Sequence, residues 1–197
     1  MVALKLNRFG RCPMREPAPP IEIQLLPAAE SDNAELMARI TELTNQVYAV
    51  AEDGLWTAGA TRTTLDEVVE LTRAGQIAVA RLSDRVVGCV RIQRLEESTG
   101  EFGMLAADPA HRGVGVGREL VRFAERKSSA EGVRSMQLEL LVPRGWTHPT
   151  KAFLTAWYTR MGYRVARTGA IDEAYPALAP LLATLCDFVI YHKRLDL

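Results

Sequence analysis

Three glycines within five residues, at positions 113, 115 and 117, narrow the choice of folds more sharply than any other segment. They follow an apolar segment that ends at Pro109, and precede a segment with apolar residues at helical spacing, from Val116 to Glu131. The first N–H groups of a helix have no partner within it, and the helix dipole adds a partial positive charge there. The pattern therefore predicts a strand, a loop and a helix that together bind an anion such as a phosphate.

Two common phosphate-binding motifs do not fit this segment. A P-loop has Lys and then Ser or Thr after its last glycine, whereas Arg118 follows Gly117 here. The dinucleotide fingerprint G-x-G-x-x-G would need a glycine at position 118 or 120, where the chain has Arg118 and Leu120. A glycine-rich turn that starts a helix without binding a ligand is the structural alternative.

The segment resembles the acyl-CoA signature of the GNAT acetyltransferases, Q/R-x-x-G-x-G/A, with Arg112, Gly115 and Gly117 in register. Residues 105–109 are similar to the L-x-V-x-P sequence that precedes it in the family, with Ala107 in place of Val. The resemblance implies acetyl-CoA as the cofactor, with its diphosphate on the loop amides and its pantetheine arm along the strand edge. The cofactor-binding residues that it implies are Leu105, Ala107, Arg112, Gly113, Val114, Gly115, Val116, Gly117 and Arg118.

Residues 157–163 are similar to a second family motif, aromatic-Tyr-x-x-x-Gly-aromatic. The resemblance implies that Tyr158 protonates the departing CoA thiolate, and a phenol is neutral at pH 7 and can donate a proton. The alternative is that Tyr158 belongs to an apolar stripe facing the core. The chain departs from the family at Lys151, seven residues before Tyr158, where Asn is common, and the connection before it is longer.

Acyl transfer to an amine also needs a base that removes a proton from the ammonium group. Glu101 occupies the strand position at which some family members carry this base, and alternation predicts that it shares a face with Gly103 and Leu105. The N–H of Leu105 is expected to polarise the thioester carbonyl. A hydrated charge at a strand end is the alternative for Glu101, and the competing bases are Glu52, Glu96, Glu97 and Glu139.

The acceptor in the family usually meets the first two helices and the segment that joins them. In this chain that segment contains Glu52 and Trp56, and a carboxylate beside an indole suits a cationic amine. The longer loop at 143–149 adds Trp146 as a third candidate for substrate binding. A polar turn around one buried Trp, and a surface loop held by Trp146, are the respective alternatives.

The order of elements predicted from periodicity is β-α-α-β-β-β-α-β-α-β-α-β, an α/β fold with helices on the faces of a mixed sheet. Asp32 with Glu35, and Thr64 with Glu67, are typical of helix starts. The resemblance implies a single GNAT-like domain over residues 21–197, with a splayed, mostly antiparallel sheet of six to seven strands. Residues 1–20 contain four prolines and are expected to form a leader or linker.

Composition restricts the function further. Lys plus Arg and Asp plus Glu both total 24, so the chain lacks the broad positive field of nucleic-acid-binding proteins. We expect no membrane span, no metal site and no disulfide framework, and therefore a soluble cytoplasmic protein. The function predicted is acetyl transfer from acetyl-CoA to a primary amine of a small molecule or peptide, in a ternary complex. A non-catalytic acyl-CoA-binding module, a longer acyl-CoA, an oxygen acceptor and a homodimer built on the terminal strands remain open.

Overall fold

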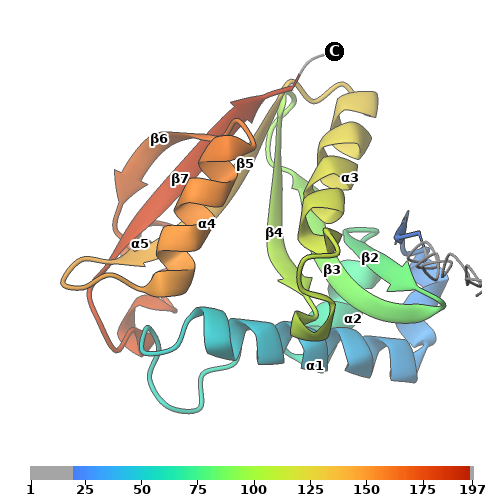
Figure 1. The fold of residues 1–197 in the computed structure, drawn as a ribbon, viewed down its shortest axis with the longest axis horizontal. Helices are drawn as coiled ribbons and strands as arrows, with labels where there is room; N and C mark the ends of the chain where they lie inside the picture. Colours follow the sequence, from blue (N-terminus) through green and yellow to red (C-terminus); the bar gives the residue numbers. More distant parts are fainter. Residues whose placement is uncertain (1–19, 196–197) are drawn as a thin grey trace, which may run out of the picture.

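The computed structural model describes residues 20–195, which form one seven-stranded sheet with helices on both faces (Figure 1). Apart from Pro20, the expected leader lies outside the described residues. The predicted order of elements is confirmed. In chain order they are β1 (Glu22–Leu25), α1 (Ala34–Ala51), α2 (Leu65–Arg73), β2 (Ile77–Leu82), β3 (Arg85–Arg94), β4 (Thr99–Ala107), α3 (Val116–Ala130), β5 (Ser135–Pro143), α4 (Pro149–Arg160), β6 (Arg164–Gly169), α5 (Ile171–Ala174) and β7 (Cys186–Arg194).

Side-chain caps explain where the first two helices begin. Thr64 caps α2, because its side chain accepts a hydrogen bond from the N–H of Glu67 at 3.1 Å, as predicted. The start predicted for α1 at Asp32 is wrong by one residue. Asn33 is the cap, accepting from the N–H of Leu36, while Asp32 ends a short 3-10 turn, Ala28–Asp32. Both residue types are good caps, so the sequence pattern could not separate them.

The sheet order is β1-β2-β3-β4-β5-β7-β6, and its one parallel pair is β4 with β5. These two central strands pair only where Thr99–Glu101 face Ser135–Gln137. Beyond that point they diverge, which Figure 1 shows as a V between β4 and β5. The sheet is therefore splayed, and the backbone edges of both strands in the V are free to pair with something else.

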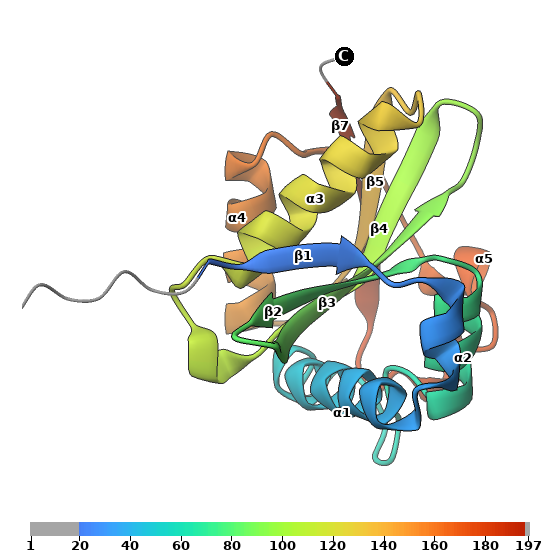
Figure 2. The same cartoon turned by 90° about the vertical axis from the view of Figure 1, so that its right-hand side faces the viewer.

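Two apolar clusters cover opposite faces of the sheet. One packs α3 and α4 against the strands and contains Phe102, Leu120 and Tyr158. The other packs α1 and α2 against the opposite face and contains Ile40, Met104 and Ala106. Figure 2 shows α3 on one side of β1–β3 and α1 on the other. Within residues 20–195, no helix combines the length and the apolar character that a membrane crossing requires.

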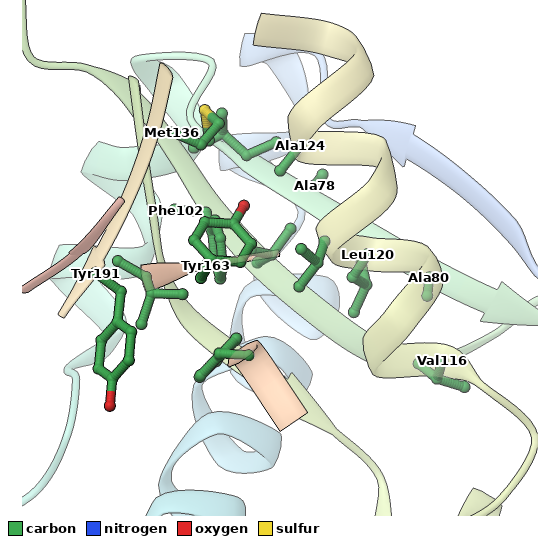
Figure 3. Packing of buried hydrophobic residues seen from close by; sticks show 14 of the residues in the cluster. Ala78, Ala80, Phe102, Val116, Leu120, Ala124, Met136, Tyr163 and Tyr191 are labelled. Atoms are coloured by element: carbon green, nitrogen blue, oxygen red, sulfur yellow. The ribbon is translucent and has the colours of Figure 1, made fainter. Parts of the chain in front are cut away.

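Small residues on the strands let α3 lie close to the sheet. In Figure 3, Val116, Leu120 and Ala124 of α3 point toward Ala78 and Ala80 of β2. At Gly88 of β3, a Cβ atom would lie 2.7 Å from Cγ1 of Val116 and 2.9 Å from Cδ1 of Leu120. The predicted anion loop (residues 108–115) leads into the first turn of α3, which is therefore held directly against the sheet.

Candidate active site

The loop before α3 presents a group of backbone N–H donors with no acceptor. Within the described residues, the N–H groups of Gly113, Gly115, Val116, Gly117 and Arg118 donate no hydrogen bond, while that of Glu119 donates to the carbonyl of Gly115. Gly115 caps α3 without a side-chain bond. These amides lie at the positive end of the helix dipole, an arrangement that is typical of anion-binding sites.

The glycines of this loop are needed for the shape of its backbone. Gly113 and Gly115 have φ angles of 86° and 100°, in the left-handed region that other residues rarely adopt. A Cβ atom on either would meet no other heavy atom within 4 Å, so space in front of the loop is open to a ligand. The ring of Trp157 on α4 lies next to the loop, 3.8 Å from where a Cβ on Gly117 would be. The fold thus brings the two sequence motifs side by side.

A β-bulge in β4 changes which residues face which side of the sheet. Met104 has a φ of 50°, the register with β3 shifts between Cys89 and Arg91, and Met104 and Leu105 have no register partner in either neighbouring strand. Leu105 consequently packs on the side of α3 and α4, whereas Met104 packs on the side of α1. The expectation that Glu101 and Leu105 share a face is wrong, because it assumed unbroken alternation.

Tyr158 is 6% exposed and lies among aromatic rings. Its ring centroid is 4.9 Å from that of Trp157 and 6.0 Å from that of Phe102. Burial, with a smaller contribution from Tyr48, raises the pKa of Tyr158 well above its usual value, so the phenol stays protonated. Its hydroxyl forms no hydrogen bond to a described residue. It differs from Thr72 Oγ1 and His111 Nδ1, which have no partner and are fully enclosed, because it keeps some accessible surface. The hydroxyl is therefore not fully enclosed by the protein.

Glu101 lies on the face of the sheet toward α1, in a buried polar group that spans the base of the V. Its two oxygens accept hydrogen bonds from Nε2 of Gln93 at 2.7 Å and from Nε2 of Gln137 at 3.0 Å. Glu139 lies beside it on β5 and accepts from the hydroxyl of Tyr175 at 2.7 Å. Burial first, and then the charge of Glu101, raise the pKa of Glu139. Such a pair of carboxyl groups can take up a proton.

Glu52 and Trp56 are brought together, as a shared site requires, but Glu52 is already paired. Its Oε1 accepts from Nζ of Lys151 at 2.6 Å, and its Oε2 accepts from Nε1 of Trp56 at 2.6 Å. Trp146 lies over the same turn, with ring atoms 3.6 and 3.7 Å from where a Cβ on Gly54 would be. The three predicted substrate residues therefore converge on the end of α1, and Lys151 holds Glu52 in place.

A cavity of about 580 Å³ opens between the 143–149 loop and α4. Its walls include the 43%-exposed indole of Trp146 and the side of Lys151. His148 caps α4 there, because its Nδ1 accepts a hydrogen bond from the N–H of Thr150 at 3.2 Å. The residues described contain no group of His, Cys, Asp and Glu side chains arranged for a metal ion.

Three contributions to the site have no local sequence signal. Gly88 seats α3, Lys151 neutralises Glu52, and Tyr175 positions Glu139. Each depends on a partner at least 28 residues away in the chain, as Gly88 does on Val116. At Lys151 the sequence shows only a departure from the Asn that is common in the family, which indicates neither the burial of this lysine nor its partner.

The splayed sheet, with unpaired loop amides at one end of the V and Tyr158 beside it, defines a fold of the GNAT acyltransferase class. The sequence profile described as "Acetyltransferase (GNAT) domain" matches residues 73–165. This range includes β4, the anion loop and Tyr158. The chain therefore carries a GNAT acetyltransferase domain. No protein of curated function has a significantly similar sequence.

Solved structures with similar folds agree with this assignment. PaiA N-acetyltransferase from Thermoplasma acidophilum in complex with coenzyme A has a TM-score of 0.66 at 15% identity, over 89% of this chain and 99% of that one. A chain of the NatC complex bound to Gag peptide and CoA has a TM-score of 0.62 at 17% identity, over 89% of this chain and 99% of that one. N-acetylglutamate synthase from Neisseria gonorrhoeae, with coenzyme A and N-acetyl-glutamate, has a TM-score of 0.58 at 16% identity, covering 90% of this chain and 35% of that one. At these identities the likeness establishes the fold.

Proposed function

We propose that this protein is an N-acetyltransferase that uses acetyl-CoA and a primary amine. The observation that carries the proposal is the group of unpaired N–H donors before and within the first turn of α3, those of Gly113, Gly115, Val116, Gly117 and Arg118. These donors fit a diphosphate, and the open space before Gly113 and Gly115 leaves room for it. Similar folds have been solved with coenzyme A bound, which supports the same cofactor here.

Acetyl-CoA would supply the acetyl group as a thioester. The divergence of β4 from β5 leaves a strand edge at Leu105 and Ala107 for the pantetheine arm, as the family resemblance implies. The N–H of Leu105, which follows the bulge, is the proposed donor to the thioester carbonyl. Tyr158 donates its hydroxyl proton toward the sulfur as negative charge develops there, because its raised pKa keeps it protonated.

The acceptor is proposed to approach from the side of α1, where Glu101 and Glu139 lie. Glu101 accepts a proton from the ammonium group directly or through water, and Glu139 beside it provides a second acceptor with a raised pKa. Glu52, Trp56 and Trp146, which meet at the end of α1, are proposed to line the outer part of the acceptor site. The free, buried Cys89 and Cys186 suit the reducing cytoplasm in which we place the protein.

The test is binding and thiol release on the purified protein. Calorimetry should detect both CoA and acetyl-CoA, and a thiol-release assay should identify turnover in a panel of amino acids, polyamines, amine antibiotics and peptides with free N-termini. Binding of CoA without release against any amine would favour a non-catalytic acyl-CoA-binding module. Release with longer acyl-CoA only, or with an alcohol only, would replace acetyl-CoA or the amine in the proposal. Absence of CoA binding would refute it.

A further inference from the structure

Asp108 directly follows β4 and is the first residue of the anion loop, and its backbone and side chain form the hydrogen bonds that shape the start of this loop. Its N–H donates to the carbonyl of Val87 at 2.8 Å, and its carbonyl accepts from the N–H of His111 at 2.9 Å. Its Oδ1 accepts from the N–H of Ala110 at 2.9 Å and so caps the 3-10 turn Pro109–His111. The direction in which the chain leaves β4 therefore depends on the orientation of this carboxylate.

Arg39 reaches the same carboxylate from α1. Its Nη2 lies 3.0 Å from Oδ2 of Asp108 and 3.3 Å from the carbonyl oxygen of Val86. One guanidinium group thus joins α1, the start of β3 and the end of β4. The two side chains are 35% and 21% exposed, so the pair is partly screened by water, yet it spans 69 positions of sequence.

The charge of Asp108 matters because of its place in the chain. A carboxylate five residues before Gly113 opposes the binding of an anion by the amides that follow. Arg39 both cancels this charge and holds Oδ2, which leaves Oδ1 directed to its capping bond. We propose that Arg39 is a positioning residue for the diphosphate loop, acting through Asp108. This inference rests on the proposed function, since it presumes that the loop binds CoA.

The experiment is calorimetric titration of the full chain with CoA. Arg39→Met should weaken CoA binding by about fivefold, the upper range for a partly exposed ion pair. Asp108→Asn keeps an oxygen that can cap Ala110 but removes the charge, so its affinity should match or exceed that of the wild type. The double variant should return to within about twofold of Asp108→Asn. If Arg39 contributed only to stability, the double variant would bind CoA as weakly as Arg39→Met, because both proteins lack Arg39.

Salt provides a second measurement that a purely structural role would not affect. The ratio of the Arg39→Met and wild-type dissociation constants should shrink toward one as ionic strength rises to about 1 M, where the Debye length is about 3 Å. Arg73→Met is the matched control, since it removes an exposed arginine that pairs with Glu70 within α2. Its CoA affinity should equal that of the wild type. If Arg39→Met does not fold, Arg39→Lys, which keeps the charge, should bind CoA within about twofold of the wild type.

The outcomes separate the two proposals. Wild-type protein that does not bind CoA overturns the proposed function, and this inference with it. Wild-type protein that binds CoA, with Arg39→Met equal to it, overturns the inference alone. A double variant that binds CoA as weakly as Arg39→Met also overturns the inference alone, because the charge of Asp108 would then have no effect on binding.

Discussion

Nζ of Lys151 lies 2.6 Å from Oε1 of Glu52, and the two side chains are only 3% and 11% exposed. The pair joins Lys151, in the first turn of α4, to Glu52, which directly follows α1, and the two are 99 positions apart in the sequence. Trp56 donates to the other oxygen of the same carboxylate. A cationic acceptor that uses Glu52 must therefore share it with Lys151, so we assign Glu52 mainly to the wall of the site.

Replacing Lys151 by Met should destabilise the protein by about 3–5 kcal/mol, because the carboxylate of Glu52 would remain buried without its counter-charge. The free energy of unfolding in urea measures this. The double variant Lys151→Met with Glu52→Gln should recover much of the loss, since no uncompensated charge remains. A single variant as stable as the wild type would show that the pair is solvated in solution.

Gly115→Ala should weaken CoA binding at least tenfold, because a residue with a Cβ atom resists the φ of 100° that orients the loop amides. Gly59→Ala is the matched control: its φ is 86°, and its Cβ would also meet nothing within 4 Å. Both changes should cost about 1–2 kcal/mol of stability. Calorimetry with CoA should separate them, and equal affinities for the two variants would count against the loop as the diphosphate site.

Tyr158→Phe should lower kcat by about 100-fold while the dissociation constant for acetyl-CoA stays within about twofold, because the lost hydroxyl acts on the departing sulfur. Steady-state thiol release and calorimetry provide the two numbers once an acceptor is known. Tyr191→Phe is the control, since among the described residues its hydroxyl has one hydrogen bond, to Oγ1 of Thr155 at 3.4 Å. Wild-type turnover in Tyr158→Phe would exclude its role as the acid.

Glu139 should make the protein less stable as pH rises. Its pKa in the folded state is raised, first by burial and then by the charge of Glu101. At pH values between the unfolded pKa of about 4.3 and the folded pKa, the native state therefore binds more protons than the unfolded state, and the free energy of unfolding falls as pH rises. Unfolding free energies measured from about pH 4 to 8 should show this fall, and Glu139→Gln should remove it. Tyr175→Phe should extend the fall to higher pH, because the hydrogen bond that lowers the pKa of Glu139 is lost. An identical pH profile for Glu139→Gln and the wild type would contradict this assignment.

Local patterns predicted most of the fold. The order of strands and helices, the cap at Thr64 and the start of α3 after Gly115 depend on residues within one or two turns of each other, and the structure confirms them. The backbone shape of the loop before α3 is also local, because unpaired amides and left-handed glycines are properties of a few neighbouring residues; binding of an anion there stays a prediction. The alternation expected along β4 is wrong at Met104, where a bulge against β3 reverses the faces.

The sequence by itself determined that a strand, a glycine loop and a helix follow one another, because the spacing of apolar residues and the backbone freedom of glycine depend only on neighbouring residues. Only the tertiary structure decided what surrounds that loop. The V between β4 and β5, the placing of Glu139 beside Glu101, and the pairs Lys151–Glu52 and Arg39–Asp108 join residues 36 to 99 positions apart. Such contacts follow from how the helices and strands pack, which no short stretch of sequence specifies.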